Sequence, residues 1–178
     1  LMESSDGSIF AGTNYLGSIF RSRDGGDTWQ ATAYDGEPLI IHSLLETSDG
    51  VILAGGELPY KDSGARVYRS ENGGGSWNMT TMGIPGHAVY SLVETYDGTI
   101  YAGTGEIVSG IVKSTDGGRT WGLCAGLGGG ETYSLMESSF GHFFAATSAA
   151  GGVFGVPTNV TVSALRRFSA SEWMHLAF

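Results

Sequence analysis

Several residue types that would mark other classes of protein are scarce in this chain of 178 residues. Cysteine occurs once, at Cys124, which excludes an intrachain disulfide and a metal site built from several cysteines. Basic residues are few, with 9 Lys and Arg against 18 Asp and Glu. An acidic chain repels phosphate backbones, so nucleic acid is not expected as a partner. No apolar run approaches the roughly 20 residues that a membrane-spanning helix needs.

Glycine is the residue type in excess, with 30 copies against 4 of proline. The glycines follow no three-residue period, which excludes a collagen helix. Hydrophobic residues make up 41% of the chain, too many for a disordered protein. The composition therefore predicts a compact, turn-rich, all-β protein.

One motif occurs four times along the chain. The copies read LMESSDGSIFAGT, LLETSDGVILAGG, LVETYDGTIYAGT and LMESSFGHFFAAT, and they begin at Leu1, Leu44, Leu92 and Leu135. The Asp-Gly pair in the first three copies predicts a two-residue hairpin turn, because such a turn needs positive φ. The small residues that end the second strand predict close approach of neighbouring sheets.

A second motif follows each of the first three copies. It reads SIFRSRDGGDTW, RVYRSENGGGSW and GIVKSTDGGRTW, and the fourth unit lacks it. The central Asp or Asn is expected to accept backbone N–H bonds inside the turn, so that no metal is needed. The ring of the final Trp is expected to be buried between neighbouring repeat units. The positions of this structural motif are Ser22, Asp24, Gly26, Trp29, Ser70, Asn72, Gly74, Trp77, Ser114, Asp116, Gly118 and Trp121.

Each repeat reads as four short strands, and a four-stranded antiparallel unit of about 45 residues is a β-propeller blade. The second motif resembles the Asp-box, or BNR repeat, of sialidase-like, sortilin-like and photosystem II assembly factor-like propellers. We therefore expect an all-β propeller over residues 1–165, with a tail that forms a short helix or a closing strand. The expected blades and tail are residues 1–34, 42–82, 90–125, 133–165 and 166–178.

Four blades form either a complete small ring or part of a larger one. An open arc would expose the apolar faces of its terminal blades. If this chain is the whole protein, we therefore expect a homo-oligomer in which copies close the ring.

A glutamate recurs at one position of every first strand, at Glu3, Glu46, Glu94 and Glu137. These carboxylates would either form a ring that holds a cation, or have a structural role in which they cap neighbouring turns or pair with the repeated Arg21, Arg69 and Lys113. We favour the structural interpretation, because a site seldom needs the same residue from every blade. The histidines are scattered without ligand spacing, so neither a metal nor a cofactor is expected.

Charged and aromatic residues that do not follow the repeat gather in loops on the face opposite the Asp-boxes. Loops on a rigid scaffold are where ligands usually bind. Pyranose rings stack on aromatic side chains and their hydroxyls bond carboxylates, so this face is a candidate sugar-binding surface. The candidates are Tyr15, Tyr34, Asp35, His42, Glu57, Tyr60, Lys61, Asp62, Arg66, His87, Glu106 and Glu131, with Tyr90 and Tyr133 bordering the same face.

The sequence thus favours a non-catalytic binding or scaffold module for a glycan or protein partner. The alternative is a glycoside hydrolase, with Asp35 and Asp62 as its carboxylate pair. Resemblance to sialidases would imply an arginine triad, but only Arg66 lies near the loops in question, so sialidase activity is not expected. The same resemblance favours an extracellular or periplasmic location.

Overall fold

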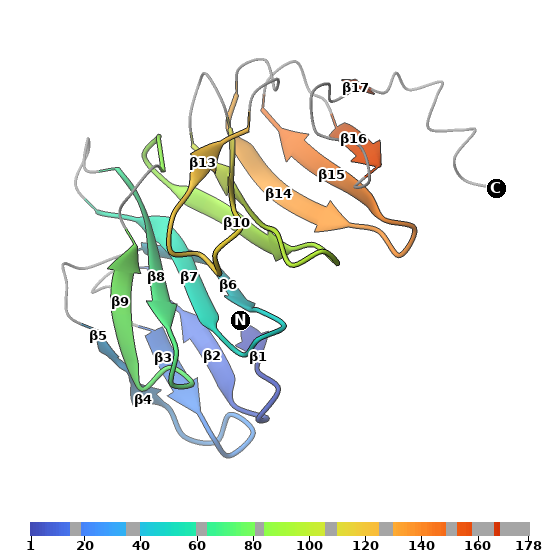
Figure 1. The fold of residues 1–178 in the computed structure, drawn as a ribbon. Coiled ribbons are helices and arrows are strands. Elements are labelled where there is room, and N and C mark those ends of the chain that lie inside the picture. The colour runs from blue at the N-terminus through green and yellow to red at the C-terminus, as the bar shows by residue number, and fades with distance from the viewer. Residues whose placement is uncertain are drawn as a thin grey trace.

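The computed structural model describes the chain in nine segments, residues 1–14, 19–34, 40–59, 64–80, 84–105, 110–124, 130–148, 153–157 and 166–167. The described residues form strands and turns and contain no helix. They fold into four largely antiparallel sheets that follow one another in chain order, from blue to red in Figure 1. The predicted all-β propeller of four-stranded blades is confirmed.

Each blade is a meander in which neighbouring strands in the chain are neighbours in the sheet. The first blade contains β1 (Met2–Glu3), β2 (Ile9–Gly12), β3 (Ile19–Ser22) and β4 (Gln30–Ala31). The second contains β6 (Ile40–Glu46), β7 (Ile52–Glu57), β8 (Ala65–Ser70) and β9 (Ser76–Thr80). The third contains β10 (Val89–Glu94), β11 (Ile100–Thr104), β12 (Ile111–Ser114) and β13 (Gly122–Leu123). The fourth contains β14 (Thr132–Glu137), β15 (His142–Thr147), β16 (Val153–Pro157) and β17 (Arg166–Arg167).

Two strands belong to blades other than those to which the sequence assigned their residues. The short strand β5 (Ala33–Tyr34) falls within the residues assigned to the first blade, but it pairs in parallel with β9 of the second. The outer strand of the last blade, β17, lies in the segment assigned to the tail. Residues 158–165, the end of the expected fourth blade, lie outside the described residues.

The turn between the first two strands of a blade is wider than the predicted two-residue hairpin. In the first blade it spans residues 4–8, and the backbone N–H of Ser4 donates to the carbonyl oxygen of Ser8 at 2.8 Å. Gly7 has a φ of 80°, so the predicted positive φ is confirmed at the glycine. Asp6 accepts the Ser4 hydroxyl at 2.6 Å and the Ser8 N–H at 2.8 Å, which explains the extra residues.

The Asp-box turns are closed by side-chain hydrogen bonds, as the motif predicted. In the first blade, Asp24 accepts the backbone N–H of Thr28 at 2.9 Å and the hydroxyl of Ser22 at 2.7 Å. Asn72 makes the corresponding bond to the backbone N–H of Ser76 at 2.9 Å. The turn therefore needs an acceptor oxygen at this position, whether charged or neutral.

Glycines at the ends of the second strands let the blades approach closely. A Cβ added to Gly12 would lie 2.2 Å from Cγ2 of Ile41 in the next blade. A Cβ added to Gly55 would lie 2.5 Å from Cγ1 of Val89, one blade further on. Both distances are too short for a real side chain, so the predicted role of these small residues is confirmed.

The repeated glutamates join each blade to the one before it. Glu46 of the second blade accepts the backbone N–H of Ser5 at 2.6 Å and its hydroxyl at 2.8 Å. Glu94 of the third blade binds Ser48 in the same way, at 2.6 and 2.9 Å. At these two positions the interpretation as caps of neighbouring turns is confirmed. The repeated Arg21 pairs elsewhere, with the turn carboxylate of its own blade.

Buried side chains fill the spaces between adjacent blades. Trp77 is 3% exposed, its ring meets Phe10 of the first blade edge-on at 6.5 Å, and its indole N–H donates to the hydroxyl of Thr32 at 3.0 Å. Trp121 is similarly buried, at 6% exposed, whereas Trp29 is 40% exposed. The prediction that the Trp ring is buried between blades is confirmed for Trp77 and Trp121. It is wrong for Trp29, whose ring is partly exposed.

Candidate functional site

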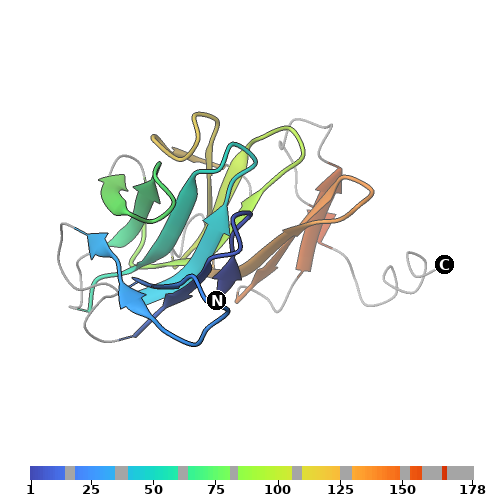
Figure 2. The same ribbon diagram turned by 90° about the horizontal axis from the view of Figure 1, so that it is seen from below.

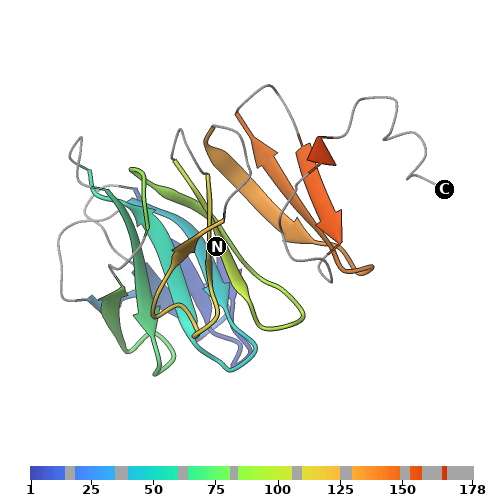
Figure 3. The same ribbon diagram turned by 45° about the horizontal axis from the view of Figure 1, so that its top comes forward.

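Three ring-bearing residues occupy the same register position on consecutive inner strands. His42, Tyr90 and Tyr133 each lie two residues before the repeated Leu of β6, β10 and β14. Their rings form a row, with centroids 5.2 Å apart between His42 and Tyr90 and 5.1 Å apart between Tyr90 and Tyr133. The inner strands run side by side through the molecule, as Figures 2 and 3 show from two further directions.

The backbone explains why these three side chains stand out from the sheets. In the second, third and fourth blades the register between the first two strands shifts at one residue of the inner strand. These residues are His42, Tyr90 and Tyr133, which are thus the unpaired residues of three β-bulges. A bulge leaves one residue outside the ladder and redirects its side chain, which is why bulges are frequent beside functional sites. Strand direction puts all three on the face opposite the Asp-box turns.

Two carboxylates and a second histidine border the row. Oε1 of Glu57, at the end of β7, lies within hydrogen-bonding distance of Nε2 of His42, at 3.3 Å. Nε2 of His87 lies 3.0 Å from the hydroxyl of Tyr90 and 3.4 Å from Oε1 of Glu131. The hydroxyl of Tyr133 donates to Oε2 of Glu131. We call His42, Glu57, His87, Tyr90, Glu131 and Tyr133 the ring cluster.

Burial and the neighbouring carboxylates raise the pKa values of the two phenols. Partial burial raises the pKa of Tyr90, and the charges of Glu131 and Glu57 raise it further. The hydrogen bond to Glu131 raises the pKa of Tyr133. Both hydroxyls therefore remain protonated at neutral pH and serve as hydrogen-bond donors.

The ring cluster is open to solvent on its outer side. Tyr133 is 50% exposed, and the side chain of His87 is 50% exposed, while those of Glu57 and Glu131 are 26% and 30% exposed. The arrangement presents ring surfaces flanked by hydrogen-bonding groups. Such a surface can stack a flat or ring-shaped ligand and bond its polar edge.

The structure brings together four of the predicted site residues, His42, Glu57, His87 and Glu131. Tyr90 and Tyr133, expected only to border this face, lie at its centre. Arg66 donates to the carbonyl oxygen of Ala65, and none of its described contacts joins it to the ring cluster. Tyr15, Asp35, Tyr60, Lys61, Asp62 and Glu106 lie outside the described residues, as does the side chain of Tyr34.

The described residues lack two further features. No group of three or more His, Cys, Asp or Glu side chains there is arranged to hold a metal ion. Nor does that part of the chain contain a helix long and apolar enough to cross a membrane.

Comparison with known proteins places this fold among the propellers. The model of the BNR/Asp-box repeat matches residues 20–31. No curated protein matches the chain by sequence. Many solved structures match by fold.

Three of these structures show the range of proteins with this fold. Virginiamycin B lyase from Staphylococcus aureus has a TM-score of 0.71 at 14% identity, over 94% of this chain and 54% of that one. PorZ, a surface component of the type-IX secretion system of Porphyromonas gingivalis, has a TM-score of 0.65 at 14% identity, over 94% and 26%. YCF48 bound to D1 peptide has a TM-score of 0.60 at 18% identity, over 92% and 50%.

This chain thus spans from about a quarter to about half of the length of those three chains. At identities this low, structural similarity shows a shared fold and does not show a shared activity. Together with the three closed Asp-box turns and the repeat match, they establish the architecture. The chain is a β-propeller with Asp-box repeats.

Proposed function

We propose that this chain is a non-catalytic binding module that recognises a glycan on the ring cluster. The observation that carries the proposal is the row formed by His42, Tyr90 and Tyr133, each the unpaired residue of a bulge. The repeated glutamates and the glycines that end the second strands make blade-to-blade contacts, whereas Tyr133 of this row is half exposed to solvent. Hydrogen-bonding partners border the side chains of the row, and the ring of Tyr133 stays accessible to a ligand.

The chemistry of a sugar ring matches this surface. The apolar face of a pyranose packs on aromatic rings, as Tyr133 offers with half of its surface exposed. Sugar hydroxyls donate to carboxylates, and Glu57 and Glu131 lie at the two sides of the row. The protonated hydroxyl of Tyr90 and the ring nitrogens of His87 supply groups that complement the sugar oxygens.

The second candidate ligand is a segment of a partner protein, in particular one with a basic side chain. The formal net charge of −9 would favour the approach of a positively charged segment. A cation held over a tyrosine ring and beside a carboxylate is a stable arrangement. The fold neighbour YCF48, which was solved with a D1 peptide bound, supports a peptide ligand as the alternative.

Binding to an array of immobilised glycans tests the first candidate, and the glycan that binds most strongly is then titrated calorimetrically. Tyr133→Ala is expected to weaken its affinity by about tenfold, because a stacked ring contributes roughly 0.5–1.5 kcal/mol beyond the area that it buries and about 1.4 kcal/mol corresponds to tenfold. Tyr96→Ala is the matched control, since Tyr96 is 99% exposed in a turn on the opposite face. Equal loss in both variants, or no glycan binding by the wild-type chain, would contradict the proposal.

The same preparation tests the enzyme alternative. The carboxylate pair predicted from the sequence, Asp35 and Asp62, lies outside the described residues, so a screen with fluorogenic glycosides decides it. Turnover that is lost in Asp35→Ala or Asp62→Ala would support a glycoside hydrolase, and binding without turnover supports a module. We also propose an extracellular or periplasmic location, which the surface location of the fold neighbour PorZ supports.

A further inference from the structure

Corresponding positions at two neighbouring blade interfaces carry opposite charges. Arg21 of the first blade and Arg69 of the second occupy the same place in the repeat, and both side chains reach the Asp-box turn of the following blade. Two residues later the first blade has Arg23 and the second has Glu71. The interface between the first two blades therefore lacks the carboxylate that its neighbour has.

At the interface of the second and third blades, that carboxylate sits between two guanidinium groups. Oε1 of Glu71 accepts from Nη1 of Arg69 and from Nη2 of Arg119, the latter at 2.9 Å. These contacts hold the pKa of Glu71 below its usual value. At this interface, the space between the outer edges of two blades thus holds a carboxylate that is bound by two arginines.

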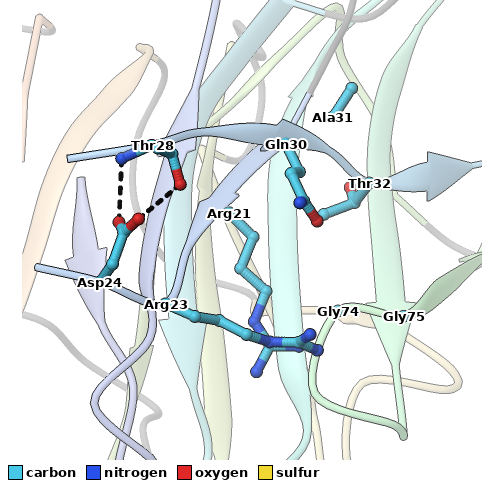
Figure 4. A pocket seen from close by; sticks show the side chains of 9 residues that line it. All are labelled: Arg21, Arg23, Asp24, Thr28, Gln30, Ala31, Thr32, Gly74 and Gly75. Atoms are coloured by element: carbon cyan, nitrogen blue, oxygen red, sulfur yellow. Dashed lines mark hydrogen bonds between the residues drawn. The ribbon is translucent and has the colours of Figure 1, made fainter. Parts of the chain in front are cut away.

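At the interface of the first and second blades, the corresponding space is a pocket of about 280 Å³. Gly75 replaces Arg119 and Arg23 replaces Glu71, so the pocket contains two arginines and no bridging carboxylate. Figure 4 shows the side chains of Arg21 and Arg23 among the residues that line the pocket, with Gly74 and Gly75 on the turn of the following blade. Gln30 also lines the pocket and adds a side-chain amide.

The two arginines differ in how they are held. The side chain of Arg21 is 11% exposed and is fixed by Asp6 at 2.7 Å, by the hydroxyl of Ser8, and by the ring of Phe10 beneath it. Arg23 is exposed, and its side chain makes no hydrogen bond or ion pair with the described residues. The N–H donors of the Arg23 guanidinium are therefore available to a ligand, whereas several of those of Arg21 are already engaged.

The carboxylate that does line the pocket is occupied elsewhere. Asp24 accepts from the hydroxyl and the backbone N–H of Thr28 and from the hydroxyl of Ser22. These bonds lower the pKa of Asp24 to about 2 and aim both oxygens into its own turn. Asp24 thus closes the Asp-box and is not free to take the place of Glu71.

We propose that this pocket binds a carboxylate group of a ligand, with Arg23 donating to it and Arg21 supplying the second positive charge. The ligand group lies in the space left where Gly75 replaces Arg119, and its carboxylate binds Arg23 and Arg21 in the way that the Glu71 carboxylate binds Arg69 and Arg119 one blade further on. Its source is either a small dicarboxylate or an acidic side chain of a partner protein. The site lies at the outer edge of the blades and is separate from the ring cluster.

The test is a titration of ¹⁵N-labelled chain with succinate and, separately, with a capped triglutamate peptide, at millimolar concentration. Binding is expected to shift the backbone amide signals of Gly74 and Gly75 and the Nε–H signal of Arg23. Tighter binding of succinate would identify a small dicarboxylate as the ligand, and tighter binding of the peptide would identify an acidic protein segment.

Two variants of equal net charge separate a site from a diffuse electrostatic effect. Arg23→Gln is expected to weaken binding of the better probe by about tenfold, because a charge-assisted hydrogen bond is lost. Arg119→Gln is expected to leave the affinity within about twofold, because Arg119 lies at the other interface. Arg23→Glu, which places a carboxylate in the pocket, is expected to abolish binding.

Equal effects of the two Gln variants, or no shift at Gly74, Gly75 and Arg23 with either probe, would overturn the proposal. Chemical-shift spectra of the unliganded variants check that each is folded. Glycan binding at the ring cluster is expected to persist in Arg23→Gln, so failure of one site does not imply failure of the other.

Discussion

The interface between the first and second blades and the interface between the second and third are built on one plan, yet they differ in chemistry. Both use a glutamate that caps the preceding turn, a glycine that admits a close contact, and a buried Trp. They differ in whether a carboxylate bridges the arginines and in whether the Trp N–H has an acceptor. Repeated positions thus hold the blades together, and departures from the repeat give each interface its own properties.

The largest expected effect concerns the buried Trp rings. Trp77→Ala should destabilise the fold by about 3–5 kcal/mol, because it opens a cavity against Phe10 at the first interface. Trp29→Ala removes a ring that is 40% exposed, and it should cost about 1 kcal/mol or less. Chemical denaturation of both variants measures the difference, and equal losses would mean that Trp29 is packed as firmly as Trp77.

The indole N–H groups distinguish the two interfaces more finely. That of Trp77 donates to Thr32, whereas that of Trp121 is buried without a partner among the described residues. Both Trp77→Phe and Trp121→Phe make the buried ring smaller, but only Trp77→Phe also breaks a hydrogen bond. Trp77→Phe should therefore lower the free energy of unfolding by about 1 kcal/mol more than Trp121→Phe does. Unfolding free energies of the two Phe variants give the comparison, and a larger loss for Trp121→Phe would contradict it.

The third interface offers a stabilising change. Glu137 accepts the backbone N–H of Tyr96 at 2.7 Å, but its other oxygen is buried with no partner in the described part of the chain. The corresponding Ser48 donates its hydroxyl to Glu94. Tyr96→Ser should therefore stabilise the fold by about 0.5–1.5 kcal/mol, measured by denaturation. The control is Tyr96→Ala, which removes the exposed ring without adding a donor, and equal stability of the two variants would refute the role of the hydroxyl.

The smallest expected effect is a difference in acid sensitivity between the Asp-boxes. Burial raises the pKa of Asp116, but hydrogen bonds from Thr120 and Ser114 outweigh it and bring the pKa from 3.8 to about 2. The unfolded chain then binds more protons between these values, so the contribution to stability is present above pH 3.8 and is lost as the pH falls towards 2. The Asn72 turn has no such titration.

Asp116→Asn makes the third Asp-box resemble the second and should flatten the loss of stability on acidification. Unfolding free energies of the wild-type and variant chains, measured over the pH range from 5 to 2, provide the test. Parallel pH curves for the two chains would show that the turn carboxylate does not contribute.

The repeated features were predictable from the sequence because each rests on local chemistry. The Asp-box bonds, the positive φ at Gly7 and the close packing at Gly55 follow from residue types at fixed spacing. The predicted hairpin length was wrong because the side chain of Asp6 organises a wider turn, which the Asp-Gly pair alone does not reveal.

The ring cluster was only partly predictable. Its four charged or histidine members were expected on one face, but the central place of Tyr90 and Tyr133 depends on bulges in strand register, which are properties of the paired sheet. Arg23 lies inside the first Asp-box motif, and the motif alone gives it no role in binding. The signal that could have identified it was its opposite charge to Glu71 at the same position of the repeat.

The most direct test of the binding surface is a map of where the bound glycan lies. Titration of ¹⁵N- and ¹³C-labelled chain with the glycan selected on the array should perturb the signals of His87, Tyr90 and Tyr133 most strongly. Perturbations centred instead on the Asp-box residues Thr28 and Thr120, with the ring cluster unchanged, would contradict the account.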